Sequence, residues 1–157
     1  MWIRRGEAGG DADGRRDACA HAVRGQYHLP HPVSLDLDRT RLGAVGGSCG
    51  VGLTLDFAAS HAGEIKGIVI LSGPSDSTQR AFIARTSSIG VLGAASVEEG
   101  AAVGYIQPVV QASPNKASRM VVLHGAGHGT DILKGSASFE ATALDWLGAR
   151  LSLPRRE

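Results

Sequence analysis

Short, nearly continuous apolar runs are the feature that most limits what this chain can fold into. The clearest runs are Lys66 to Leu71 and Arg119 to His124, which lack the alternation of a half-exposed strand. A strand of this kind is buried on both faces, as in a parallel sheet that helices cover on each side. The sequence therefore predicts an α/β fold: a three-layer sandwich with a mostly parallel sheet.

Helical stretches separate the strands in βα alternation. The other two strands are expected at Arg41 to Val45 and Ile89 to Ala95. Helices are expected at Val51 to His61, at Ala101 to Val110 with a disturbance at Pro108, and at about Ala137 to Leu151. The last of these carries one apolar stripe that should face the sheet. An aromatic content of 4% and 22 glycines fit a closely packed core of Val, Ile, Leu and Ala.

The 157 residues fit one domain with flanking segments. Residues 1–35 lack sustained periodicity, and Pro30 and Pro32 favour an extended connector there. We therefore expect a poorly ordered segment over 1–35, an α/β domain over 36–152 and a frayed tail over 153–157.

Charge and composition exclude several classes of partner. A net charge of +1 gives no field that would favour nucleic acid or an anionic membrane, so small neutral molecules fit better. No apolar run approaches the roughly 20 residues of a membrane span, and the N-terminus lacks a signal-peptide core. Two cysteines, Cys19 and Cys49, are too few for a disulfide framework. The sequence predicts a cytoplasmic protein.

The most informative motif is Gly46-Gly47-Ser48-Cys49-Gly50, which joins a predicted strand to a predicted helix. A sharp strand-to-helix turn at G-x-S-x-G exposes the serine hydroxyl and directs the following backbone N–H groups toward it. Ser48 is thus the candidate nucleophile, and the N–H of Cys49 is the candidate oxyanion donor. The Cys49 side chain is expected to pack as a small hydrophobe.

A nucleophilic serine needs a base, and the base needs an acid to orient it. His128 is the candidate base, because it lies in a glycine-rich loop after the last strand; His124, at the strand end, is the weaker choice. After the preceding strand, Glu99 is weighted above Glu98, since Glu99 adjoins Gly100 and would start the next helix. Asp76, one strand earlier, is a further reserve acid.

The order Ser48, Glu99, His128, each after a strand, resembles the α/β-hydrolase family. Three segments look like those of bacterial hydrolases related to dienelactone hydrolases: Gly-Gly-Ser-Cys-Gly-Val, Leu-Ser-Gly-Pro and Gly-Ala-Gly-His-Gly-Thr-Asp. The resemblance covers about Asp36 to Leu151 and implies a serine hydrolase that cleaves an ester or related acyl bond. It implies no metal and no organic cofactor.

Two departures from the family matter. Dienelactone hydrolases place cysteine at the nucleophile position, whereas serine occupies it here and cysteine follows. The family also has several strands before its elbow, with a loop that donates a second oxyanion N–H, and no such strand series or His-Gly-Gly loop is recognisable before Ser48. The chain thus resembles the C-terminal part of the domain, with N-terminal strands missing or reduced.

These departures keep an alternative open: a non-catalytic truncated remnant, or a partner-binding half-domain. Such a piece would expose a sheet edge and self-associate through it.

Other classes of site, for metals and for nucleotides, are rejected. The possible metal ligands Cys19, His21, His28 and His31 match no standard zinc spacing, and the glycines before Ser48 match no dinucleotide or P-loop pattern.

Overall fold

The computed structural model describes residue 38 and residues 40–152. Four strands form one sheet: β1 (Leu42–Gly47), β2 (Ile65–Leu71), β3 (Gly90–Ser96) and β4 (Arg119–Leu123). The helices are α2 (Gly50–Ser60), α3 (Ser77–Arg85), α4 (Ala102–Ala112), α5 (Asp131–Gly135) and α6 (Ala137–Arg150), with a 3₁₀ turn, η1 (Val97–Glu99). The expected segment 1–35, the tail and the four possible metal ligands lie outside the described residues, and the division into domains stays a prediction.

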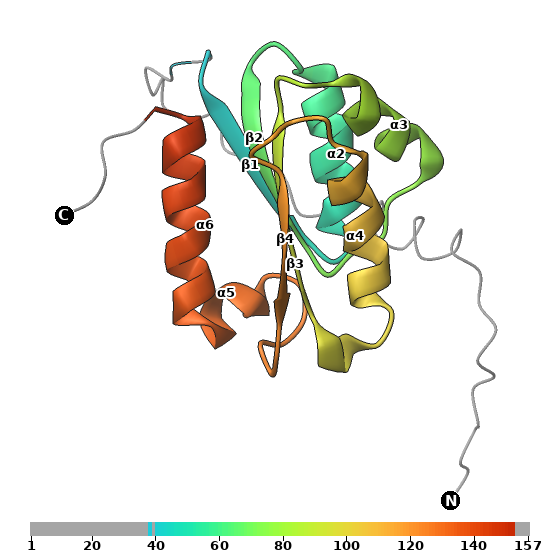
Figure 1. Ribbon diagram of the computed structural model, residues 1–157, viewed down its shortest axis with the longest axis vertical. Coiled ribbons are helices and arrows are strands. Elements are labelled where there is room, and N and C mark those ends of the chain that lie inside the picture. The colour runs from blue at the N-terminus through green and yellow to red at the C-terminus, as the bar shows by residue number, and fades with distance from the viewer. Residues whose placement is uncertain (1–37, 39, 153–157) are drawn as a thin grey trace, which may run out of the picture. The chain divides into compact units, whose positions relative to one another are not determined.

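The sheet is entirely parallel, in the order β1-β2-β3-β4. Helix α6 covers one face of it and α2, α3 and α4 cover the other (Figure 1). This is the predicted three-layer α/β sandwich. Among the described residues no strand precedes β1, so the strand that leads to Ser48 stands at one edge of the sheet.

Burial explains why the two middle strands have the most continuous apolar sequences. Every residue of β3 is buried, and in β2 only Lys66 is not. The edge strands β1 and β4 alternate more, with Val45 and Val122 each 48% exposed. A central strand of a parallel sheet meets helices on both faces, whereas an edge strand keeps one side toward solvent.

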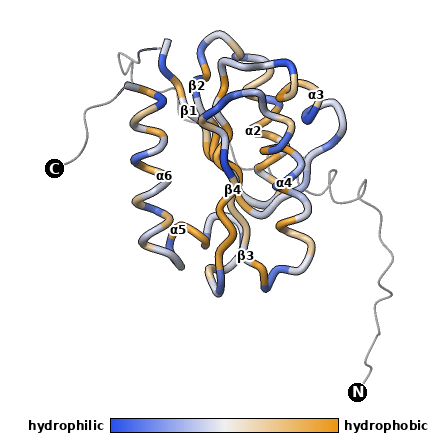
Figure 2. Tube along the Cα trace, viewed as in Figure 1, coloured by the Kyte–Doolittle hydropathy of each residue, from blue (hydrophilic) through white to orange (hydrophobic). Residues whose placement is uncertain are grey.

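Two apolar clusters form the core, one on each face of the sheet. The first contains buried residues of α2, α3 and α4 together with Ile68, Ile70 and Val91. The second contains Val69, Leu71 and Leu92 with Phe139, Ala143 and Trp146 from the predicted stripe of α6. Figure 2 shows the apolar strands enclosed between the layers. Successive residues of β2 thus enter opposite clusters, as the pleat of a strand requires.

Three short elements were not predicted. Helix α3 begins at Ser77 with Asp76 as its N-cap, η1 follows β3 directly, and α5 spans five residues after the His128 loop. They are too short for an amphipathic period to show. Pro108 lies inside α4, and the helix continues to Ala112.

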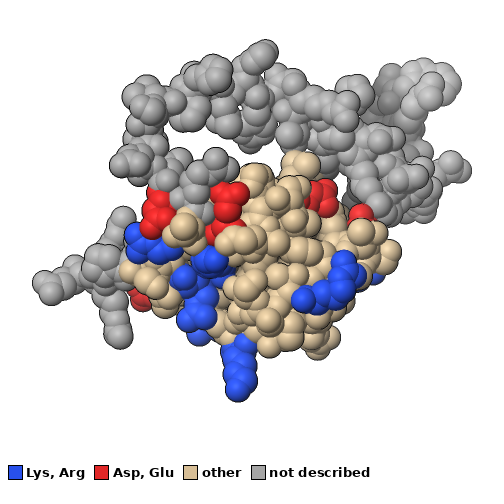
Figure 3. Space-filling view, turned by 90° about the horizontal axis from the view of Figure 1, so that it is seen from above, with Lys and Arg blue, Asp and Glu red and all other residues tan. Residues whose placement is uncertain are grey.

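The two ends of the sheet carry different parts of the chain. Figure 3 views the end where the strands begin and shows Lys and Arg side chains, with Asp and Glu side chains near them, among other residues. Arg41 directly precedes β1, and Lys66 and Arg119 lie at the starts of β2 and β4. The opposite end, at the bottom of Figure 1, carries the loops after the strands, and the predicted site lies there.

Within the described part of the chain, no helix combines the length and apolar character that a bilayer span requires.

Candidate active site

Ser48 occupies a strained turn between β1 and α2. Its φ of 55° lies in the left-handed region, which L-residues other than glycine rarely adopt. The turn is held by two hydrogen bonds, from the Ser48 N–H to the Leu71 carbonyl (2.8 Å) and from the Val51 N–H to the Ser48 carbonyl (3.1 Å). The predicted elbow is present, and it carries its hydroxyl at the carboxyl end of the sheet.

Close packing explains the glycines around this turn. A Cβ on Gly47 would lie 2.7 Å from the Thr130 backbone nitrogen, and a Cβ on Gly73 would lie 2.0 Å from the Ser48 carbonyl oxygen. Neither distance is tolerable, so a side chain at either position would displace the elbow. Gly50, the last glycine of the motif, has no heavy atom within 4 Å of such a Cβ. Space alone therefore does not require glycine there.

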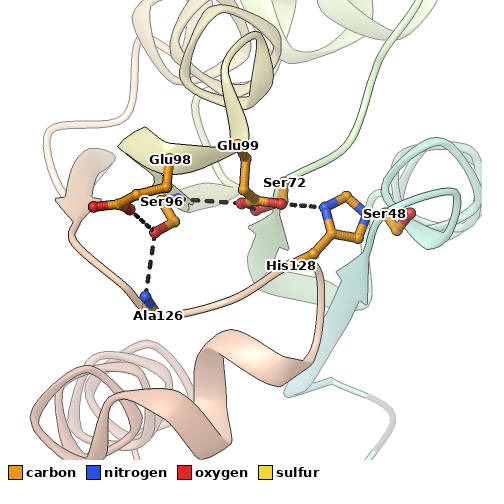
Figure 4. Close-up of polar contacts among 7 residues, drawn as sticks. All are labelled: Ser48, Ser72, Ser96, Glu98, Glu99, Ala126 and His128. Atoms are coloured by element: carbon orange, nitrogen blue, oxygen red, sulfur yellow. Dashed lines mark hydrogen bonds and ion pairs between the residues drawn. The ribbon is translucent and has the colours of Figure 1, made fainter.

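Ser48, His128 and Glu99 form one chain of polar contacts (Figure 4). Ser48 Oγ lies 2.8 Å from His128 Nε2, and His128 Nδ1 contacts Glu99 Oε1. The His128 side chain is 59% exposed, whereas that of Glu99 is 12% exposed. The structure thus brings together the three residues that the sequence singled out, from the ends of β1, β3 and β4.

The second carboxylate oxygen of Glu99 has its own donors. Ser72 Oγ donates to Glu99 Oε2, and the Ser96 N–H donates to the same oxygen at 3.3 Å. Ser72 is buried and, like Ser48, has a positive φ, of 49°. Sequence reasoning missed Ser72. Its signal was available in Leu71-Ser72-Gly73-Pro74, which ends β2 at the same edge as the other site residues.

Glu98 faces a different set of groups from its neighbour. Its Oε2 accepts hydrogen bonds from Ser96 Oγ (2.6 Å) and the Gly125 N–H (2.8 Å). The Ser96 hydroxyl and then the Gly125 N–H lower the pKa of Glu98 to about 2. In the structure the His128 ring contacts Glu99, whereas Glu98 contacts the Ser96 hydroxyl and the Gly125 N–H.

Asp76 and His124, the other reserve candidates, also have different roles. Asp76 is the N-cap of α3, accepting from the Gln79 N–H at 2.8 Å while Gln79 Oε1 accepts from the Asp76 N–H at 3.0 Å. His124 is 80% exposed, and its Nδ1 lies 3.5 Å from Glu98 Oε1. Among the residues that the structure describes, no three His, Cys, Asp or Glu side chains are grouped to hold a metal ion.

Cys49 differs from expectation in its side chain. It is exposed, so the prediction that its thiol packs inside is wrong. The residue is the N-cap of α2, and its side chain makes no cap hydrogen bond. Its N–H donates to no other described residue, as expected of a group at the unsatisfied positive end of a helix.

Comparison with known proteins shows a similarity of fold alone. No family model matches the chain, and no curated protein matches its sequence. A crystal structure of a predicted CIB-like hydrolase from Thermoplasma acidophilum matches with a TM-score of 0.55 at 17% identity. The two proteins share an α/β fold. The match covers 88% of this chain and 62% of that one. The likeness is one of fold alone and does not extend to the dienelactone hydrolase branch.

Proposed function

We propose that the chain is a serine hydrolase that cleaves an ester or a related acyl bond. The observation that carries the proposal is the continuous contact from Ser48 Oγ through the His128 ring to the Glu99 carboxylate. The nucleophile has a base within hydrogen-bond reach, and the base has an acid on its other nitrogen, which is the arrangement that activates a hydroxyl.

Each residue then has a defined step. Ser48 Oγ attacks the carbonyl carbon while His128 Nε2 takes the hydroxyl proton, and Glu99 stabilises the resulting imidazolium. The Cys49 N–H donates to the oxyanion of the tetrahedral intermediate. His128 returns the proton to the leaving alcohol. Water then attacks the acyl-serine, with His128 again as base, and releases the acid and Ser48.

The strain at the elbow supports the same conclusion. An unfavourable φ at a serine persists only where the surrounding structure enforces it, and such residues cluster at functional sites. Ser48 and Cys49 directly precede α2, so the Cys49 N–H belongs to the positive end of that helix, which favours a developing oxyanion. We infer a small neutral ester as substrate.

Hydrolysis of p-nitrophenyl acetate tests the proposal directly. Ser48→Ala should lower kcat by a factor on the order of 10⁶. Cys49→Ala is the matched control, because it removes the neighbouring thiol and keeps the backbone N–H; its kcat should stay within about twofold of the parent. A fluorophosphonate probe should label Ser48, as mass spectrometry would show. Wild-type activity equal to that of Ser48→Ala, with no labelling, would refute the proposal, and a label on Cys49 would reassign the nucleophile.

One observation favours a second candidate, a non-catalytic half-domain that associates with another copy of itself. Among the described residues, β1 pairs only with β2, and Val45 on β1 is 48% exposed. An open strand edge is a template for pairing with another chain. Sedimentation of the full chain should then show a dimer that Val45→Lys weakens, while Ser48→Ala changes no property. A monomer at all concentrations would contradict this candidate.

A further inference from the structure

The loop that carries His128 is rich in glycine, so its conformation has to be fixed by contacts with other residues. Gly125, Gly127 and Gly129 all have positive φ, at 61°, 85° and 57°. Glycine makes these conformations accessible, but it also leaves the unfolded loop with many alternatives. The position of the imidazole therefore depends on contacts between this loop and the rest of the molecule.

Two successive backbone N–H groups of the loop are bound at the end of β3. The Gly125 N–H donates to Glu98 Oε2 at 2.8 Å, and the Ala126 N–H donates to Ser96 Oγ at 3.2 Å. The Ser96 hydroxyl in turn donates to Glu98 Oε2 at 2.6 Å. Ser96 and Ala126 are 1% and 2% exposed. Figure 4 shows Glu98, Ser96 and Ala126 of this group beside the pair formed by His128 and Glu99.

Adjacent residues of one 3₁₀ turn thus hold two parts of the same loop. Glu99 contacts the imidazole ring, and Glu98 binds the backbone three residues before that ring. The Ser96 N–H and hydroxyl join the two carboxylates, since the first donates to Glu99 and the second to Glu98. The ring and its loop are therefore fixed to a single short segment.

We propose that Glu98 is a positioning residue: by binding the Gly125 N–H directly and the Ala126 N–H through Ser96, it sets the His128 ring against Ser48 and Glu99. The catalytic part of this inference rests on the proposed function. The remaining side-chain neighbour of Glu98 is His124, 3.5 Å away on the outer side and largely exposed, so that contact adds little. We call these three hydrogen bonds the tether; the two that Glu98 Oε2 accepts, from the Gly125 N–H and the Ser96 hydroxyl, are charge-assisted and therefore of the stronger kind.

Steady-state kinetics separate positioning from general stability. Glu98→Ala should lower kcat for p-nitrophenyl acetate by about 10- to 100-fold, the cost of a small displacement of a catalytic group, and change KM by less than about twofold. Glu98→Gln keeps one acceptor oxygen and should recover part of the loss. In a His128→Ala background, Glu98→Ala should cause no further loss, because a residue that acts through His128 has nothing left to position. An additive loss in that background would overturn the proposal.

Backbone amide exchange gives a readout that needs no turnover. In the parent protein the Gly125 and Ala126 N–H groups should be protected, and Glu98→Ala should raise their exchange rates by at least about tenfold and shift the His128 ring signals in NMR spectra. Glu140→Ala, which removes an exposed carboxylate from α6, is the matched control and should change neither. If the parent shows no turnover but Glu98→Ala frees these amides and shifts the ring, the proposed function fails and the tether stands. Unchanged exchange and ring signals in Glu98→Ala would overturn the tether.

Discussion

The serine half of the candidate site and its histidine–acid half are held by different kinds of interaction. The serine half is a short turn whose shape follows from backbone strain at Ser48 and from steric contact with Gly47 and Gly73. The histidine–acid half consists of a glycine-rich loop and a 3₁₀ turn joined by hydrogen bonds of Glu98 and Glu99.

This difference decides how each half responds to substitution and to pH. The elbow is held by a backbone hydrogen bond to Leu71 and by close packing against Gly73 and Thr130, and close packing changes little with pH. The contacts of the other half join residues 27 to 29 positions apart, and they depend on ionised carboxylates. Substitutions should therefore affect the serine half through sterics and the histidine half through charge.

Within the histidine–acid half, the largest expected effect of a charge substitution on turnover comes from removing the charge of Glu99. Glu99→Gln keeps the shape of the side chain but offers an amide to His128 Nδ1, which favours the wrong tautomer and no longer stabilises the imidazolium. We expect kcat to fall by about 10⁴-fold with little change in KM. Stopped assays with p-nitrophenyl acetate measure this, with Glu140→Gln as the exposed control. A loss below about tenfold would mean that Glu99 does not act as the acid.

A steric change at the elbow should have a smaller effect on rate and a clear effect on stability. In Gly73→Ala the new Cβ meets the Ser48 carbonyl, so we expect a loss of about 1–3 kcal/mol in the free energy of unfolding. A shift of Ser48 should also lower kcat by up to about 100-fold. Urea denaturation and the esterase assay measure the two effects.

Gly104→Ala is the matched control for that substitution. Gly104 lies in α4, and a Cβ there meets no heavy atom within 4 Å. Alanine should stabilise the helix by about 0.5–1 kcal/mol and leave kcat unchanged. Equal stability of the two alanine variants would show that packing against Gly73 does not hold the elbow.

The smallest effect concerns the pH dependence of the histidine–acid half. The pKa of Glu98 is lowered from 4.5 to about 2 in the folded chain, so its stabilising contribution is present above pH 4.5 and is lost as the pH falls toward 2. The melting temperature of the parent should exceed that of Glu98→Gln near pH 6, and the two should converge near pH 2. Asp38, whose pKa is also about 2, contributes equally to both proteins. A difference in melting temperature that is independent of pH would contradict the role of the charge.

Much of the fold follows from the sequence because its signals are local. The four apolar runs predict four strands within one or two residues of their observed ends, and the stripe of α6 predicts its buried face. Such patterns do not reveal short helices, as α3 and α5 show. The Cys49 side chain was assigned wrongly, because its direction depends on where α2 begins relative to the elbow.

For the candidate site, the chain order of Ser48, an acid and His128 was visible in the sequence, since parallel strands bring their carboxyl ends to one edge. The tertiary structure alone decided that Glu99 meets the imidazole while Glu98 binds the Gly125 N–H. The two glutamates are adjacent, and the reason given for preferring Glu99, a helix starting there, does not hold, because α4 begins at Ala102. What separates them is the direction of each side chain on the 3₁₀ turn. The same is true of Ser72, whose buried hydroxyl reaches Glu99 only because β2 and β3 are neighbours in the sheet.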